Sequence, residues 1–145
     1  MKLSLRAWEP VFDALKEALG PELFLRLRGD WRARQATEVR HVLADSTQRV
    51  WVAAAVGGTA VGFVAAKLHR ELDLGEIYII AVDPAVQGQG IGMALTRVAT
   101  DWLRESGMRV AMIETGGDPG HAPARRLYEK AGYTPLPAVR FFKTL

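Results

Sequence analysis

Hydrophobic and polar positions are patterned most clearly in the middle of the chain. Residues 76–82 read Glu-Ile-Tyr-Ile-Ile-Ala-Val, a run of β-branched and aromatic residues that ends at Asp83-Pro84. Because proline removes a ladder donor and starts a turn, this run predicts a buried strand. Glycines follow at alternate positions, and apolar residues then recur at helical spacing, at Ile91, Leu95, Val98 and Trp102. The pattern predicts a strand, a glycine-rich turn and a helix in direct succession.

The N-terminal part of the chain predicts a short strand followed by three helices. The weak alternation of residues 2–8 favours an edge strand, and helical spacing follows over residues 12–19, 22–28 and 31–43. Gly20-Pro21 and Gly29-Asp30 separate the helices, and an aspartate at position 30 can cap the third one. In this third helix we expect the arginines to face solvent and three residues to face inward, namely Val39, Val42 and Leu43.

The remaining elements complete a mixed sheet. Gly57-Gly58 between two β-rich runs, residues 49–56 and 59–69, predicts a hairpin, which forms an antiparallel meander with the strand that begins at Glu76. The helix after the glycine turn is expected to end at Ser106-Gly107, where glycine can adopt the left-handed conformation. The last predicted elements are a strand over residues 109–114, a helix from about Pro123 to Gly132, and a closing strand over residues 139–145. This order predicts one α+β domain, residues 1–145, with helices on both faces of the sheet.

The composition excludes several kinds of chemistry. The 145 residues are 49% hydrophobic and 24% charged, as in an ordinary globular chain, and the absence of cysteine removes disulfides, thiolate metal sites and a cysteine nucleophile. No apolar run approaches the roughly 18 residues of a membrane span, and no signal-peptide core follows the first residues, so we expect a cytoplasmic protein without a membrane partner. The net charge of +3 favours an anionic ligand but is too small to indicate nucleic acid.

The glycine-rich turn predicts a phosphate site. Backbone N–H groups at the start of a helix lack intrahelical partners, and the helix dipole favours negative charge there. The dinucleotide fingerprint requires glycine at the position of Met93, and the P-loop requires a Gly-Lys-Ser/Thr end that this chain lacks. Both patterns therefore fail, and the turn either binds a phosphate or pyrophosphate of another kind of ligand or simply caps the helix.

Three segments resemble the GNAT family of N-acetyltransferases in the same order. They are Gly62-Phe63-Val64, residues 76–95 with the Gln87-x-x-Gly90-x-Gly92 loop, and residues 124–133, which read Ala-Arg-Arg-Leu-Tyr-Glu-Lys-Ala-Gly-Tyr. The resemblance covers about residues 50–135. It implies a central sheet, mostly antiparallel, that splays between its fourth and fifth strands and holds the pantetheine arm of acetyl-CoA in the gap. It also implies transfer of an acetyl group from this co-substrate to a primary amine of a small metabolite, peptide or protein.

The resemblance assigns the coenzyme contacts. Main-chain N–H groups near Ala81-Val82 are expected to bind the pantetheine and the oxyanion, and the turn is expected to bind the pyrophosphate. Arg125 and Lys130 are either further phosphate ligands or exposed cations, and His121 stands where the family often has asparagine. The predicted cofactor-binding residues are Ala81, Val82, Gln87, Gly88, Gln89, Gly90, Ile91, Gly92, His121 and Arg125.

The resemblance also assigns two catalytic residues. Tyr128 is the predicted general acid, since its phenol can protonate the coenzyme A thiolate, although it also lies on the apolar stripe of its helix. Glu76 is the predicted general base, acting through water, or else a solvated carboxylate at the start of its strand. Tyr78 is expected on the same face, lining the acceptor pocket or packing. Aromatic residues in the region of the family's acceptor site either line it or pack in the core, namely Trp8, Phe12, Phe24 and Trp31.

Other mechanisms find little support in the sequence. The three histidines have no metal-ligand spacing, and no serine lies in a Gly-x-Ser-x-Gly elbow. Without a cysteine either, direct attack of the amine on the thioester is the simplest route. An alternative function is a coenzyme A-binding sensor or partner-binding module that has lost catalysis. A basic nucleic-acid-binding domain is disfavoured, because the arginines between Arg32 and Arg40 lack interleaved aromatics beyond Trp31. The closing strand could pair across a homodimer.

Overall fold

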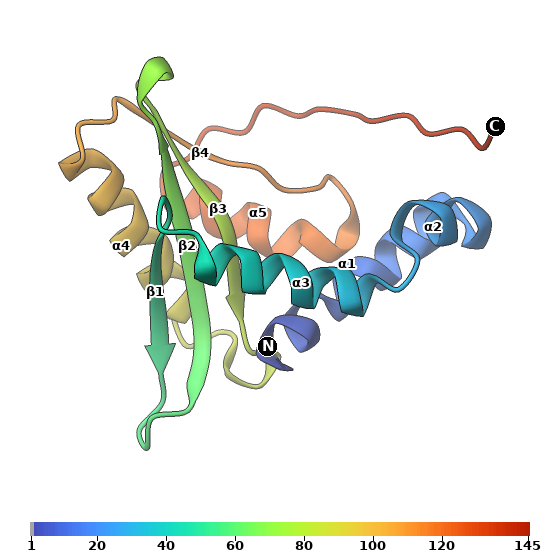
Figure 1. Cartoon of the computed structure of the whole chain (residues 1–145), viewed down its shortest axis with the longest axis horizontal. Coiled ribbons are helices and arrows are strands. Elements are labelled where there is room, and N and C mark those ends of the chain that lie inside the picture. The colour runs from blue at the N-terminus through green and yellow to red at the C-terminus, as the bar shows by residue number, and fades with distance from the viewer. Residues whose placement is uncertain (1) are drawn as a thin grey trace.

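The structure is a computed structural model that describes residues 2–145, with three N-terminal helices, a four-stranded sheet and two further helices (Figure 1). In chain order the elements are α1 (Lys2–Leu19), α2 (Pro21–Arg28), α3 (Trp31–Ala44), β1 (Arg49–Ala54), β2 (Ala60–His69), η1 (Arg70–Leu72), β3 (Leu74–Val82), η2 (Pro84–Val86), α4 (Ile91–Glu105), β4 (Val110–Ile113), η3 (Pro119–His121) and α5 (Ala122–Lys130). None of these helices combines the length and the apolar character needed to cross a membrane.

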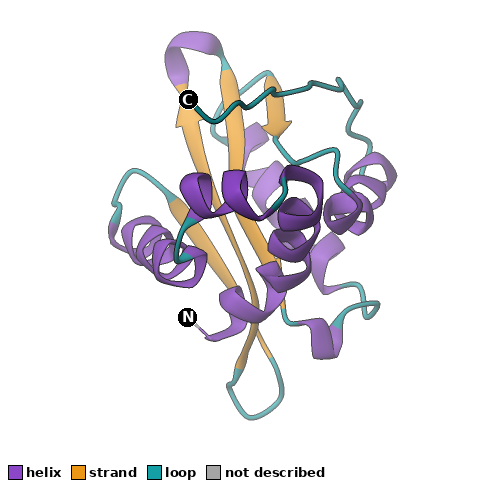
Figure 2. Ribbon diagram, turned by 90° about the vertical axis from the view of Figure 1, so that its right-hand side faces the viewer, coloured by secondary structure: helices purple, strands orange, loops and turns teal. Residues whose placement is uncertain are grey.

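The sheet has the order β1-β2-β3-β4 and separates two helical layers (Figure 2). The first three strands are antiparallel, as predicted, and β4 is parallel to β3. On one face Val39 and Val42 of α3 pack with Phe63 and Ile79. On the other face the core includes Leu103 and other apolar residues of α4. The α+β fold with helices on both faces is therefore confirmed.

A β-bulge at Tyr78 changes which side chains of β3 face each layer. Ala66 of β2 pairs with Ile77 and Ala65 with Ile79, so that Tyr78 is the extra residue. As a result Ile77 packs in the core on the α4 side, whereas Ile79 packs in the core on the α1 and α3 side. Bulges re-aim side chains in this way and often lie near active sites.

The sheet splays open after this bulge. Strand β4 pairs only with the first part of β3, from Leu74 to Ile77, and β4 itself ends at Ile113. The second half of β3 continues to Val82 with β2 as its only sheet neighbour within residues 2–145. The predicted splay is present, but it lies between the third and fourth strands because the chain does not open with a strand.

The predicted edge strand over residues 2–8 is wrong, because these residues form the first two turns of α1. The same segment also has helical spacing, since Leu3, Ala7 and Val11 recur every four residues. Leu3 and Val11 of this stripe are buried. Pro10 lies inside this helix and is exposed. Its missing N–H removes one hydrogen bond but does not end the helix.

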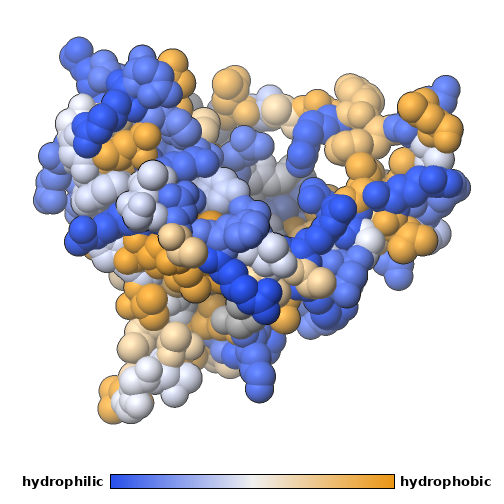
Figure 3. All heavy atoms as spheres, in the orientation of Figure 1, coloured by the Kyte–Doolittle hydropathy of each residue, from blue (hydrophilic) through white to orange (hydrophobic). Residues whose placement is uncertain are grey.

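The predicted closing strand over residues 139–145 is also absent. This segment is extended, forms no strand, and leaves the body of the molecule with its apolar side chains exposed, Phe141 at 91% (Figures 1 and 3). Pro135 and Pro137, which cannot donate to a ladder, precede it. Pairing of this segment across a homodimer stays a prediction.

In α3 the predicted cap is confirmed and one predicted inward residue is wrong. Asp30 caps α3 by accepting a hydrogen bond from the Ala33 N–H at 3.1 Å. Leu43 is exposed rather than inward, because the buried stripe of α3 passes through Val39 and Val42 and leaves the next residue outside. The helix predicted after the glycine turn is present as α4, which buries Leu95, Thr96, Ala99 and Leu103.

Gly75 is required where β3 crosses α4. A Cβ at this position would lie 2.4 Å from Leu103 Cδ2, far inside van der Waals contact. We expect Gly75→Ala to lower the free energy of unfolding by about 1–3 kcal/mol, because Leu103 is fully buried and has no room to move. Urea unfolding followed by circular dichroism measures the change. The matched control is Gly117→Ala, whose Cβ would meet nothing within 4 Å, and equal midpoints for the two variants would contradict the steric argument.

Candidate active site

The open edge of β3 presents backbone N–H groups. The Asp83 N–H donates to Val61 O at 2.8 Å, which directs that amide toward β2. Amide directions alternate along a strand, so the Ala81 N–H also faces β2, whereas the Ile80 and Val82 N–H groups face the gap left by β4. Of the two predicted residues, Val82 is therefore the one whose amide is directed toward a ligand in the splay.

The glycine-rich turn continues directly from this edge. Gly88 and Gly90 have φ angles of 81° and 82°, a left-handed conformation that side chains rarely adopt, and Gly90 is the N-cap of α4. The Ala94 N–H donates to Gly90 O at 3.0 Å, but within residues 2–145 the N–H groups of residues 88–93 donate no backbone hydrogen bond. These unpaired donors at a helix start are suited to bind an anion.

Asp83 and Arg6 anchor the turn, and no local pattern predicts their contact, because they lie 77 residues apart in the chain. Asp83 accepts a hydrogen bond from the Ala85 N–H at 3.1 Å and forms an ion pair with Arg6 of α1. The hydrogen bond from Arg6 lowers the pKa of Asp83. This carboxylate stays charged at neutral pH and holds the first residues of the turn against α1.

Tyr128 lies on α5, which packs closely against the start of α4. A Cβ on Gly92 would lie 3.1 Å from Leu127 Cδ2, so glycine allows this approach. The Tyr128 side chain is buried, and burial raises its pKa to about 12. No hydrogen-bond partner of its hydroxyl is found in the described part of the chain, in contrast to Tyr133, whose hydroxyl lies 2.6 Å from Thr100 Oγ1. Tyr128 is thus a protonated phenol whose hydroxyl makes no hydrogen bond within residues 2–145.

Glu76 lies beside two basic side chains. Its Oε2 is 2.7 Å from His69 Nε2 and 3.4 Å from Lys67 Nζ, and it is largely shielded from solvent. Lys67 Nζ also lies 4.0 Å from the ring centroid of Tyr78. Glu76 is therefore not a solvated carboxylate, and it does not line the cavity described below.

His121 and Arg125 both brace the loop before α5. His121 Nδ1 is 2.6 Å from Asp118 Oδ1, and its ring packs edge-on against Trp8. Arg125 Nη1 donates to Gly116 O at 2.6 Å and to Asp118 O at 2.8 Å. Both side chains already have partners in this structure, and coenzyme contacts at these two residues stay a prediction.

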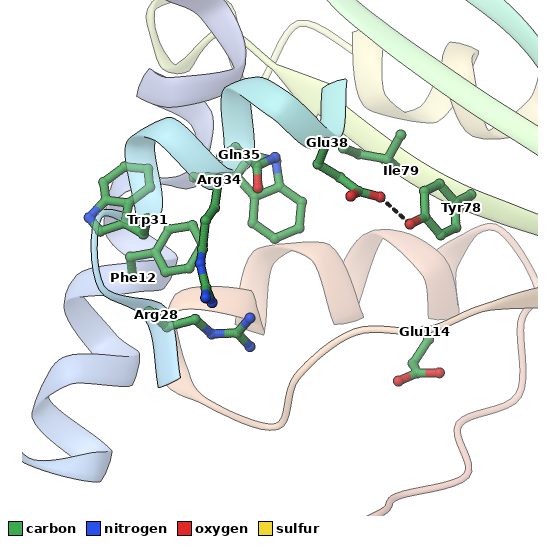
Figure 4. Close-up of a pocket in the computed structure, with 10 residues that line it drawn as sticks. Phe12, Arg28, Trp31, Arg34, Gln35, Glu38, Tyr78, Ile79 and Glu114 are labelled. Atoms are coloured by element: carbon green, nitrogen blue, oxygen red, sulfur yellow. Dashed lines mark hydrogen bonds between the residues drawn. The ribbon is translucent and has the colours of Figure 1, made fainter. Parts of the chain in front are cut away.

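A cavity of about 460 Å³ lies on the α1 and α3 side of the bulge (Figure 4). It is lined by Trp8, Phe12, Arg28, Trp31, Arg34, Gln35, Glu38, Tyr78, Ile79 and Glu114. Tyr78 donates a hydrogen bond to Glu38, which with partial burial raises the pKa of Tyr78 to about 12. The structure thus brings together Tyr78 and three of the four predicted aromatic residues, whereas Phe24 packs in the core.

The charged residues of this cavity were not predicted from the sequence. Glu38 and Arg34 lie on the arginine-rich helix that was interpreted as a solvated face, and Glu114 follows the last strand. One signal was present, since Trp31, Gln35 and Glu38 recur at helical spacing. No group of three or more His, Cys, Asp or Glu suited to a metal is found within residues 2–145.

The family profile and the similar protein that match this chain both indicate an acetyltransferase. The profile of the acetyltransferase (GNAT) family matches residues 8–133. A mycothiol acetyltransferase of Amycolatopsis mediterranei is 34% identical over 119 residues, which cover 72% of this chain and 38% of that protein. The chain thus spans about two fifths of the length of this relative.

Solved structures share the fold. A mutant Bacillus halodurans protein aligns with a TM-score of 0.73 at 12% identity and covers 99% of this chain and 93% of its own. An aminoglycoside acetyltransferase from a soil metagenomic sample, in complex with sisomicin, aligns with a TM-score of 0.60 at 21% identity. That alignment covers 92% of this chain and 90% of the other. At these identities the likeness shows the fold alone.

Proposed function

Because this chain belongs to the GNAT family of acetyltransferases, whose members use acetyl-CoA, we propose that it transfers an acetyl group from acetyl-CoA to a primary amine. The observation that carries the proposal is the continuity between the open edge of β3 and the glycine turn, both of which present unpaired N–H groups. The test is release of free coenzyme A that depends on an added amine. Release at the same rate without any amine would contradict the proposal.

The coenzyme is proposed to lie along this continuous line of donors. Its pyrophosphate binds the unpaired N–H groups within residues 87–92, where the dipole of α4 adds to the attraction. Its pantetheine arm enters the splay and pairs with the Ile80 and Val82 N–H groups. The thioester then lies near the bulge at Tyr78, beside the cavity that α1 and α3 cover.

The reaction is proposed as direct attack. The neutral amine nitrogen attacks the thioester carbonyl, and a main-chain N–H of the open edge stabilises the oxyanion of the tetrahedral intermediate. The carbon–sulfur bond then breaks, and Tyr128 donates to the departing thiolate. Glu76 accepts the amine proton through water, and the proximity of Lys67 and His69 holds its carboxylate in place.

Glu76→Gln tests the base. A general base must be deprotonated, so the rate of the native protein falls at low pH, and removal of the carboxylate should lower kcat by roughly 100-fold or more and flatten this acidic limb. The measurement is kcat/KM between about pH 5 and pH 9. Glu71→Gln, on the exposed helix η1, is the control and should leave the profile unchanged. An unaltered profile for Glu76→Gln would assign the base to another group, with Glu38 and Glu114 as the cavity carboxylates to test next.

A coenzyme-binding module without catalysis is the second candidate. One observation favours it: the carboxylate of Glu76 already contacts Lys67 and His69 and does not line the cavity. Binding of acetyl-CoA with no release of coenzyme A for any amine in a panel would support this alternative. An amine acceptor is the proposed partner, as in the aminoglycoside acetyltransferase crystallised with sisomicin.

A further inference from the structure

The acceptor cavity holds four charged side chains that do not neutralise one another. Arg28 and Arg34 contribute two cations, and Glu38 and Glu114 contribute two anions. None of the four forms an ion pair within residues 2–145, whereas Arg6, Arg26, Arg32 and Arg104 all do. Separated charges of both signs in one cavity are complementary to a ligand that carries both signs itself.

We propose that the acceptor is an amine that also carries a carboxylate, as a free amino acid does, with the carboxylate held by Arg28 and Arg34. This inference rests on the proposed acetyl transfer and specifies the substrate class of that site.

The carboxylates of Glu38 and Glu114 indicate where the amine of the acceptor binds. Glu114 directly follows β4, at the mouth of the splay where the thioester is expected. Glu38 accepts a hydrogen bond from Tyr78 at the bulge, on the same side of the cavity (Figure 4). An ammonium group that enters here is attracted before it loses its proton and attacks. The amine of the acceptor therefore lies between β3 and the end of β4.

The two guanidinium groups lie at the other end of the cavity. Arg28 is in the last turn of α2 and Arg34 in the first half of α3, and Figure 4 shows both side chains extending toward the same space. Arg34 Nη1 donates to Leu27 O at 2.8 Å, which fixes its direction and leaves its other N–H groups free. Two neighbouring guanidinium groups repel unless an anion lies between them, and their planar forks match a carboxylate.

Aromatic side chains line the arginine end of the cavity (Figure 4). Phe12 and Trp31 stack with ring centroids 4.3 Å apart, and the Arg28 guanidinium lies 6.0 Å from the Phe12 centroid. An apolar side chain of the acceptor can pack on this surface. A polycationic acceptor such as an aminoglycoside is disfavoured in the same place, because its ammonium groups would meet Arg28 and Arg34.

The experiment compares amines that differ only in the carboxylate. Coenzyme A release is measured with phenylalanine against phenylethylamine and with lysine against cadaverine, and sisomicin represents a polycation. We expect kcat/KM to be at least roughly tenfold higher for the member that carries the carboxylate. Equal values within both pairs, or a preference for sisomicin, would overturn the inference.

Variants locate the carboxylate site. Arg28→Gln and Arg34→Gln should each raise KM for the amino acid by roughly tenfold to a hundredfold, with little change for the matched amine or for acetyl-CoA. Arg26→Gln is the control, since Arg26 pairs with Glu22 on the outside of α2 and should leave all constants unchanged. Loss of activity toward both members of a pair, or no loss at all, would overturn the assignment.

The two proposals fail in different ways. If no amine releases coenzyme A, the proposed acetyl transfer fails. Calorimetric titration of phenylalanine into the protein then tests separately whether Arg28 and Arg34 bind a carboxylate. Binding that Arg28→Gln weakens supports it, and absence of binding overturns it.

Discussion

Tyr128→Phe is expected to lower kcat by roughly 100-fold or more while leaving the Kd of acetyl-CoA almost unchanged. The substitution keeps the buried ring and its packing on α5 but removes the hydroxyl, which has no other partner within residues 2–145. In the proposed reaction this hydroxyl touches the ligand only as the thiolate departs. A group that acts mainly in the transition state affects kcat rather than binding. Steady-state release of coenzyme A and calorimetric titration of acetyl-CoA measure the two quantities.

The pKa of Tyr128 shapes the expected pH dependence. Burial raises it to about 12, so the phenol stays protonated across the whole working range and remains a donor. A thiol near pKa ~8.5 is about 3.5 pKa units more acidic, so complete proton transfer is uphill by roughly 5 kcal/mol, and Tyr128 acts mainly as a hydrogen-bond donor to the developing thiolate. We therefore expect no decline of kcat that is due to Tyr128 below about pH 11.

Tyr133→Phe is the matched control for this prediction. Its hydroxyl is bonded to Thr100, so its loss should lower the free energy of unfolding by about 1 kcal/mol and change kcat little. A Tyr128→Phe protein that turned over at the native rate would show that Tyr128 is a core residue only.

The second large effect is expected for Gly90→Val, which should weaken acetyl-CoA binding by roughly 100-fold. Gly90 has a φ of 82°, which a β-branched residue adopts only under strain, so the turn must change its shape. The new side chain would also cover N–H groups that are proposed to bind the pyrophosphate. Each lost hydrogen bond to a charged group is worth about 1.5–3 kcal/mol. Calorimetric titration of acetyl-CoA gives the change in Kd.

Gly57→Val is the control that separates a loss of coenzyme binding from a loss of stability caused by backbone strain. Gly57 has a similar positive φ of 101° in the β1–β2 hairpin, and a Cβ at either glycine would meet nothing within 4 Å. Both variants should lose comparable stability, but only Gly90→Val should lose affinity for the coenzyme. Equal affinities of the two variants for acetyl-CoA would show that the glycine turn is not part of the coenzyme site.

Local signals account for the part of the fold that was predicted correctly. Gly57-Gly58 forms the turn of the hairpin, Asp30 caps the start of α3, and Asp83-Pro84 ends β3. Each of these acts through its own backbone conformation or hydrogen bonds, which a local pattern can predict. The glycine turn and the helix after it were predicted for the same reason. The resemblance to the GNAT family supplied the splay, which no local pattern contains.

Features that depend on distant contacts were missed. Residues 2–8 form a helix because Leu3 packs against Val39 and Ile79, which lie far along the chain. The bulge at Tyr78 depends on the register with β2, and the charge pattern of the cavity depends on how α2 and α3 lie over β3. Leu43 was predicted to face inward and residues 139–145 to form a closing strand, but Leu43 and the apolar side chains of that segment are exposed.

A crystal structure of the complex with acetyl-CoA would show whether the glycine turn and the open edge of β3 bind the coenzyme. We expect the pyrophosphate oxygens within about 2.7–3.2 Å of backbone nitrogens in residues 87–92, and the pantetheine arm along Ile80 and Val82 in the splay. A pyrophosphate bound at any other place on the molecule, with the turn free of ligand, would contradict this binding mode.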